Sequence, residues 1–174
     1  MKETMYHSPV LLAASVSGLN IRPASVYVDA TFGGGGHSQE ILDNMDNKSK
    51  LFAFDQDEDA QRNTIEDTRF TFIPQNFGYL KRFMKFHKID KVDGILADLG
   101  VSSHQFDTPN RGFSIRFDGP LDMRMNQHQE LTAKEIVNAY SESRLADLFF
   151  SYGELRNAKK IAQLIFQNLS LIHI

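Results

Sequence analysis

The chain alternates short apolar runs with segments in which apolar residues recur at helical spacing. The apolar runs occupy residues 26–30, 51–55, 70–73 and 92–98, and three of them contain or end in an aspartate: Asp29, Asp55 and Asp98. Runs that are apolar on both faces are typical of the buried strands of a parallel sheet. Helical stretches separate the four runs, which implies right-handed crossovers between parallel strands. The pattern therefore predicts an α/β fold.

Helical spacing and helix-start signals predict the remaining elements. Ser8 suits an N-cap with Pro9 in the first turn, and Thr132 with Glu135 forms a capping box. The expected helices occupy residues 9–19, a stretch from the glycine-rich turn to 45, and residues 57–65, 79–91, 132–140, 143–151 and 154–168.

The segment 79–91 has the pattern of an amphipathic helix and forms the best basic patch of the chain. Its apolar positions, at i, i+3, i+4 and i+7, are Leu80, Phe83, Met84 and His87. Four cations lie largely on the other side: Lys81, Arg82, Lys85 and Lys88. Such a run is usually a solvated face, and the alternative is a surface that meets phosphates.

Four consecutive glycines, residues 33–36, follow the first apolar run and precede a helix. A turn without Cβ atoms lets a ligand approach the backbone closely, and the first amides of the next helix then face that ligand. Asp55 ends the second run about 20 residues beyond the glycines. A carboxylate at this position commonly accepts hydrogen bonds from ribose hydroxyls. Its competitors are Asp57, Glu58 and Asp59, which better suit the acidic first turn of a helix. A nucleotide-like ligand is favoured over a plain glycine turn because the turn, Asp55 and Asp98 share the carboxyl edge of the sheet.

Several single residues have two readings. Taken alone, Phe77 favours the core, His37 a helix N-terminal turn, and His7 an ordinary surface position. Residues 106–129 form a loop too long for a routine connection, which makes its three arginines candidates for contacting substrate phosphates. These are Arg111, Arg116 and Arg124. The alternative is that they pair with Asp107, Asp118 and Asp122, and the two readings stay open.

Composition narrows the class of protein. The chain has 174 residues, 41% hydrophobic, a net charge of −3 and no cysteine. This length suits one compact domain, and the absence of cysteine excludes disulfides and thiolate metal sites and fits a reducing cytoplasm. No run approaches the roughly 18 apolar residues of a membrane span, so a soluble cytoplasmic protein without a resident metal is expected.

Six stretches, in order along nearly the whole chain, together resemble the RsmH (MraW) family. They are residues 7–12, 29–38, 98–105, 111–114, 120–125 and 152–154. The resemblance implies a class I (Rossmann-like) methyltransferase that transfers a methyl group from S-adenosylmethionine to the exocyclic N4 of a cytosine in small-subunit ribosomal RNA, free or in its particle. It implies a donor-binding core over residues 1–105, interrupted by a helical insertion over 106–174. The methyl-donor contacts carried over by resemblance are Gly35, Gly36, His37, Asp55, Phe77, Asp98 and Gln105.

The target amine must lose a proton as it is methylated. We hypothesise that the base is splayed out and that Asp98, or a backbone carbonyl in residues 98–101, accepts that proton. Many amino-methyltransferases have a proline-rich acidic motif here, whereas this chain has Leu99 and Gly100, so the acceptor stays open.

Family members are longer than this chain, which ends inside the expected insertion. We therefore expect a truncated product with weak or no activity that self-associates through the apolar run 92–98, left as an unpaired sheet edge. Three alternatives remain: a methyltransferase with another acceptor, a nicotinamide-dinucleotide protein, and a non-catalytic donor-binding fragment. The spacing Gly33-x-Gly35-x-x-Ser38 argues against the second, because the third glycine of that fingerprint is missing.

Overall fold

A computed structural model describes residues 9–172, so the predictions for His7 and Ser8 lie outside its described part. The chain divides into two compact units. The first comprises Met1–Ser103 and Met125–Gln127, and the second His104–Arg124 and His128–Ile174.

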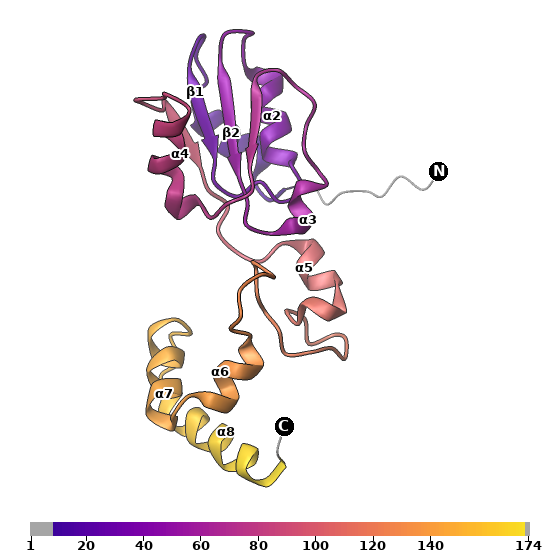
Figure 1. Cartoon of the computed structure of the whole chain (residues 1–174), viewed down its shortest axis with the longest axis vertical. Helices are drawn as coiled ribbons and strands as arrows, with labels where there is room; N and C mark the ends of the chain where they lie inside the picture. Colours follow the sequence, from indigo (N-terminus) through magenta and orange to yellow (C-terminus); the bar gives the residue numbers. More distant parts are fainter. Residues whose placement is uncertain (1–8, 173–174) are drawn as a thin grey trace, which may run out of the picture. The chain divides into compact units, whose positions relative to one another are not determined.

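The first unit is built on a parallel sheet of four strands (Figure 1). The strands are β1 (Val26–Asp29), β2 (Lys50–Phe54), β3 (Phe70–Ile73) and β4 (Gly94–Leu96), in the order β3-β2-β1-β4. Val28 lies opposite Phe52 on one side and Ile95 on the other. The predicted α/β class and all four predicted strands are confirmed.

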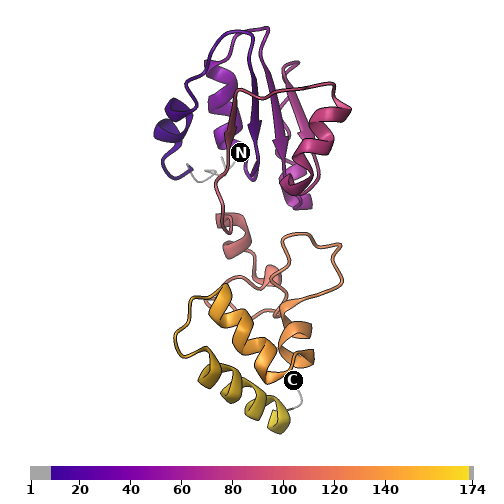
Figure 2. The same ribbon diagram turned by 90° about the vertical axis from the view of Figure 1, so that its left-hand side faces the viewer.

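Helices cover both faces of this sheet (Figure 2). On one face α1 (Leu12–Gly18) and α2 (Gly36–Asn44) pack through Val16 and Ile41 against Tyr27 and Leu51. On the other face α4 (Leu80–Phe86) packs through Met84 against the face that carries Val28. Residues 51–54 of β2 are buried throughout, as its run of apolar residues on both faces predicts.

Two predicted helices of the first unit are shorter than expected. α3 spans only Glu58–Gln61, because the polar residues after it offer no apolar face to pack. The predicted helix 79–91 is the 3₁₀ turn η1 (Phe77–Tyr79) followed by α4. It ends early because Lys88 takes a left-handed φ of 60°, the conformation that commonly stops a helix.

The second unit is helical in its described part. Its elements are α5 (Ser103–Asp107, beginning at the boundary), η2 (Pro109–Arg111), α6 (Ala133–Ala139), α7 (Glu142–Ser151) and α8 (Ala158–Ile172). Leu145 and Ala146 pack with Ala162 between α7 and α8. The capping box of Thr132 and Glu135 is confirmed at the start of α6. α8 begins later than predicted, since Glu154 has a φ of 52°. None of the helices in residues 9–172 is long and apolar enough to cross a membrane.

Candidate functional site

The carboxyl edge of the sheet brings the glycine turn and two of the predicted acids together. β1 ends at Asp29 and leads into the glycines, β2 ends immediately before Asp55, and β4 ends two residues before Asp98. In parallel sheets this edge is where ligands bind. The site is therefore built from the exits of β1, β2 and β4.

The glycine turn has a backbone that other residues would strain. Gly33 has φ 51°, and Gly35, the N-cap of α2, has φ 81°. A Cβ on Gly35 would lie 3.1 Å from the Phe32 ring, and one on Gly36 would lie 2.5 Å from Pro9. The chain therefore needs glycine here both for conformation and for space. The first-turn amides of α2 have no intrahelical partner and are available to a ligand.

Asp55 holds the turn from the end of β2. Its Oδ2 accepts a hydrogen bond from the Gly33 amide at 2.8 Å, and its Oδ1 accepts one from the Asp57 amide at 2.9 Å. Asn63 donates from Nδ2 to the Gly33 carbonyl at 2.9 Å. Burial raises the pKa of Asp55 above its ordinary value, and the donated amide hydrogen bonds oppose that shift. Each carboxylate oxygen has a second lone pair with which it can accept another donor.

Asp29 anchors the start of α2 and the exit of β1. Its side chain is fully buried; Oδ2 accepts from the Ser38 hydroxyl at 2.7 Å and Oδ1 from the Thr31 amide at 3.0 Å. The Thr31 hydroxyl in turn accepts from the Asp98 amide at 2.8 Å. Burial raises the pKa of Asp29, opposed by the Ser38 hydrogen bond. Hydrogen bonds thus link β1, α2 and the exit of β4.

His37 is the second residue of α2 and is 5% exposed. Its Nε2 has no hydrogen-bond partner among the described residues. A buried polar atom without a partner costs about 1–3 kcal/mol. It therefore marks a position where a ligand can supply the missing partner.

The other predicted donor contacts lie as follows. Phe77 opens η1 and is 43% exposed, so it is not a core residue. Asn76 fixes this turn by accepting from the Gly78 amide at 2.8 Å. The Asp98 side chain is exposed. Gln105 lies in α5 and belongs to the second unit, so the first unit alone does not supply it.

The acidic residues after Asp55 start helix α3, as predicted when Asp55 was preferred to them as the ribose ligand. Asp57 is the N-cap of α3 and accepts from the Asp59 amide, and Glu58 and Asp59 occupy the first turn. No group of three or more His, Asp or Glu side chains in residues 9–172 is arranged to hold a metal ion.

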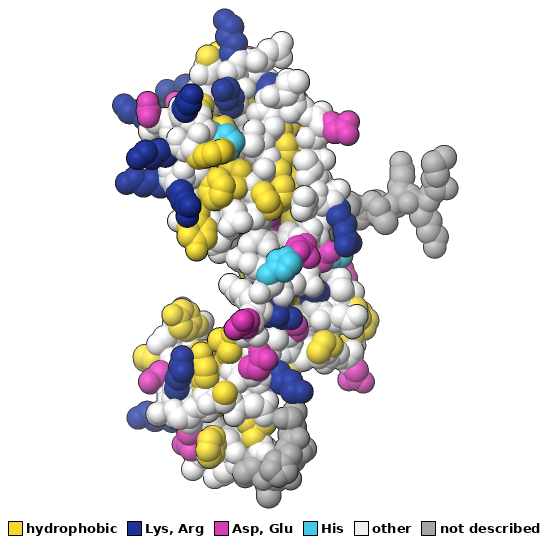
Figure 3. Space-filling view, in the orientation of Figure 1, with side chains coloured by type: hydrophobic (Ala, Val, Ile, Leu, Met, Phe, Trp, Pro, Cys, Tyr) yellow, Lys and Arg dark blue, Asp and Glu magenta, His cyan; other side chains and the backbone are white. Residues whose placement is uncertain are grey.

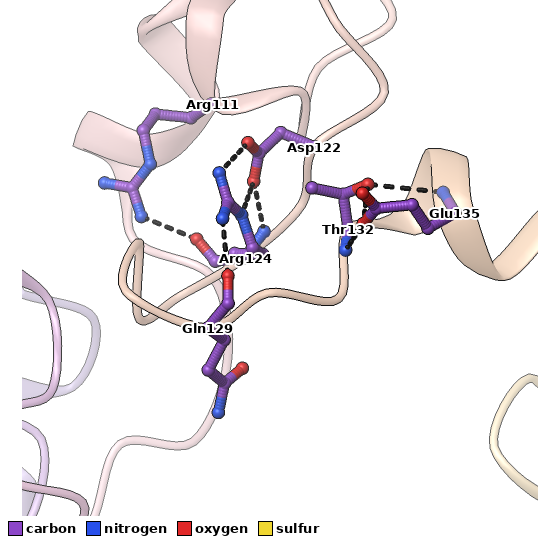
Figure 4. Close-up of polar contacts among 6 residues, drawn as sticks. All are labelled: Arg111, Asp122, Arg124, Gln129, Thr132 and Glu135. Carbon is purple, nitrogen blue, oxygen red and sulfur yellow. Dashed lines mark hydrogen bonds and ion pairs between the residues drawn. The ribbon is translucent and has the colours of Figure 1, made fainter.

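The long loop of the second unit is organised around Arg124 (Figure 4). Arg124 makes two hydrogen bonds to the Asp122 carboxylate, at 2.9 and 2.7 Å, and also donates to the Gln129 carbonyl. Arg111 is buried and donates to the Arg124 carbonyl at 2.9 Å. The Arg124 guanidinium lowers the pKa of Asp122. Of the two interpretations of the loop arginines, ion pairing therefore holds for Arg124, whose partner is Asp122.

Arg116 differs from the other two arginines of the loop. Its side chain is 74% exposed, and its contact with Asp107, at 3.9 Å, is long. A surface pair of this kind contributes little stability and leaves the guanidinium accessible.

Comparisons with known proteins show which family the chain belongs to. A family model described as the MraW methylase family matches residues 4–171. The chain belongs to the MraW methylase family. It is 57% identical over 161 residues to the ribosomal RNA small subunit methyltransferase H of Phocaeicola vulgatus, covering 92% of this chain and 53% of the relative. For the proteins of the same name from Flavobacterium johnsoniae and Christiangramia forsetii, identity is 60% and 59%, over 96% and 92% of this chain and 56% and 53% of theirs. The chain thus spans about half the length of these curated relatives.

In this MraW-family chain, sequence reasoning missed the residues that hold the site together. Thr31 and Ser38 lie inside the glycine-turn motif, and their hydroxyls were the available signal, since each can bond locally to strand-end groups. Asn63 carries no signal in the sequence, because it reaches Gly33 across 30 residues from a polar turn.

Proposed function

We propose that this chain binds S-adenosylmethionine at the glycine-turn edge and is part of an enzyme that methylates the exocyclic N4 of a cytosine in small-subunit ribosomal RNA. The hydrogen bond from the Gly33 amide to Asp55 carries the proposal. It brings the carboxylate suited to a ribose directly beside the glycine turn. Family membership and the printed names of the relatives, which are ribosomal RNA methyltransferases, support the same reaction.

The residues present fit this donor. Asp55 would accept hydrogen bonds from the ribose hydroxyls, and the exposed Phe77 ring would lie against the adenine. The Gly36 amide and His37 would hold the methionine tail, and Gly35, whose amide donates to the Phe32 carbonyl, would let the tail approach the backbone. Gln105 belongs to the second unit, and its role as a donor contact rests on the family resemblance alone. When bound, the donor supplies an electrophilic methyl group. The protein's task is then alignment of the attacking amine, which can lower a barrier by roughly 7–11 kcal/mol.

Asp98 is the candidate acceptor of the amine proton, together with the backbone carbonyls of residues 98–101. Its side chain is exposed, and its amide is fixed by the Thr31 hydroxyl at 2.8 Å. Fixing the main chain positions both the carboxylate and the neighbouring carbonyls for a base splayed out of its stack.

Arg116 is the loop arginine best suited to a substrate phosphate, because its guanidinium is accessible. Arg111, which is buried, and Arg124 would contribute by holding the loop. A ribosomal RNA substrate would place this activity in the cytoplasm.

Calorimetry with S-adenosylmethionine and NAD tests the donor. We expect the chain to bind the first and not the second. Asp55→Ala should weaken donor binding about 10- to 100-fold, as loss of a hydrogen bond to a charged group does. Asp55→Asn keeps an acceptor for the Gly33 amide and should fall between the two. NAD binding, or donor binding insensitive to Asp55→Ala, would contradict the assignment.

Mass spectrometry of ribosomal RNA tests the reaction. This chain and a full-length relative would be incubated with small-subunit RNA or its particle, each with and without Asp98→Asn. Methylation at cytosine N4 by the relative, reduced strongly by Asp98→Asn with unchanged donor affinity, is the expected result. We propose that this chain alone is weakly active or inactive. Full activity of Asp98→Asn would leave only the backbone carbonyls as acceptors.

A second proposal concerns self-association. β4 is an edge of the described sheet, and its Ile95 is 52% exposed. Unpaired edges of this kind pair readily with another chain. We therefore expect a homodimer by light scattering that Ile95→Lys returns to monomer. A monomer at high concentration would reject this proposal without affecting the donor site.

A further inference from the structure

The outer face of α4 has no role in the site described above. Lys81, Lys85 and Lys88 follow the spacing i, i+4, i+7 and are exposed. The opposite face is packed on the sheet through Leu80, Phe83 and Met84. Lys81 and Lys85 lie within α4 and are about 6 Å apart along its axis. Lys88 follows the end of α4, so the three cations form a short row along the chain that begins on a helix whose apolar face is already used.

Arg82 and Lys91 extend this row, so that five cations occur within residues 81–91 and the only acid there is Asp90. None of the five forms an ion pair with a carboxylate in the described part of the chain. Figure 3 shows Lys and Arg side chains gathered over the α4 side of the first unit. The whole chain carries a charge of −3, so this surface reverses the sign locally.

Two exposed aromatic rings flank the row. Phe86 is 77% exposed and meets His87 edge-on, and Tyr79 is 52% exposed. Proteins that bind single-stranded nucleic acids combine aromatic side chains with cations, because bases stack on the rings while phosphates bind the cations.

We propose that this α4 surface, defined by Lys81, Arg82, Lys85, Lys88, Lys91 and Phe86, binds the phosphate backbone of single-stranded RNA. The proposal rests on the proposed function in one respect, that the substrate is RNA. An anionic membrane fits less well, because an interfacial helix inserts a broad apolar face and that of α4 is buried against the sheet. The α4 surface adjoins one residue assigned to the donor, because Phe77 opens the 3₁₀ turn that leads into α4, and it would hold RNA flanking the target.

The test is the salt dependence of RNA binding by this chain, measured by fluorescence anisotropy with a labelled unstructured RNA. Each phosphate neutralised on a single strand contributes about 0.7 to the slope of log affinity against log salt. The triple variant K81Q/K85Q/K88Q should therefore lose about 2 from that slope and bind at least about tenfold more weakly at 100 mM salt. Phe86→Ala should lower affinity and leave the slope unchanged.

The matched control is R22Q/K48Q/K50Q, which removes the same charge from exposed positions of the same unit. It should keep most of the affinity. An equal loss in control and triple variant, or an unchanged slope in the triple variant, would overturn the proposal. So would lysine-dependent binding to phosphatidylglycerol vesicles without any effect on RNA.

Calorimetry on the same variants separates this proposal from the donor site. The triple variant should bind S-adenosylmethionine as the parent does. If the parent binds no donor yet binds RNA through these lysines, the donor site fails and the α4 surface stands. If donor binding is normal and RNA binding ignores the lysines, the reverse holds.

Discussion

The two units hold their loops by opposite means. In the first, the buried acid Asp29 accepts hydrogen bonds from a backbone amide and a hydroxyl, and Asp55 accepts two backbone amides. In the second, the half-buried Asp122 pairs with the guanidinium of Arg124. Burial raises the pKa of the first pair of acids, and the arginine lowers the pKa of the third.

The two arrangements differ in which polar groups each unit leaves available to a ligand. Acids that bond to the backbone fix main-chain geometry, so that amides and a glycine turn can face a ligand. An arginine pair fixes side chains, and all three guanidinium nitrogens of Arg124 donate within its own loop. The first arrangement leaves backbone amides for a ligand, and the second holds a loop together.

Removing the buried acid should have the largest effect. Asp29→Ala leaves the Ser38 hydroxyl and the Thr31 amide without their acceptor, which should lower the free energy of unfolding of the first unit by about 2–3 kcal/mol. Asp29→Asn retains an acceptor and should lose less than half as much. Urea unfolding with hydrogen exchange over residues 26–44 measures both, and equal losses would show that the hydrogen bonds do not matter.

Adding a Cβ to the turn should have the next largest effect. Gly35→Ala combines a φ of 81° with crowding against Phe32, so we expect a loss of about 2 kcal/mol and weaker donor binding. Gly33→Ala is the matched comparison, because its φ is 51° but a Cβ there meets nothing closer than 4.0 Å. It should cost about 1 kcal/mol. If the two substitutions cost the same, crowding contributes nothing.

Patterns that repeat along the chain predicted much of this fold. Apolar runs located the strands, including β2 with its buried faces, and helical spacing gave the buried side of α4. The capping box at Thr132 fixed the start of α6 within a residue, because capping depends on neighbours in sequence.

Contacts between distant residues could not be predicted in this way. Thr31 meets the amide of Asp98 across 67 residues, a bond that exists only because β1 and β4 are neighbours in the sheet. The early end of α4 and the late start of α8 depend on left-handed conformations of Lys88 and Glu154, residue types without that preference. Burial statistics favoured a core position for Phe77, which is 43% exposed; only the family resemblance predicted a ligand contact there.

Removing a cap in the second unit should have a smaller effect than either change in the first. Thr132→Ala removes the side-chain acceptor of the Glu135 amide at 3.2 Å, which should cost α6 about 1 kcal/mol. Hydrogen exchange over residues 132–140 measures it. Thr132→Ser keeps the hydroxyl and should match the parent, so that a loss in the serine variant would indicate packing rather than capping.

Substitution of Asp122 should have the smallest effect on stability. The pH dependence of that effect is where the two units differ most. Asp122→Asn removes the arginine pair, and protection from exchange over residues 121–136 should fall only about two- to fivefold at pH 7, as for other solvent-accessible pairs. Because the folded pKa of Asp122 lies below its ordinary value of 3.8, its contribution is present above that value and is lost as pH falls.

Asp29 should show the opposite sign. Its folded pKa lies above 3.8, so the folded state binds the proton more tightly than the unfolded state does. The ionised carboxylate therefore lowers stability above the raised pKa, and stability rises as pH falls from there toward 3.8. Exchange measured from pH 3 to 7, relative to Asp29→Asn in one unit and Asp122→Asn in the other, should give slopes of opposite sign. Slopes of the same sign would mean that burial of Asp29 and ion pairing of Asp122 do not make the stabilities of the two units depend on pH in opposite ways.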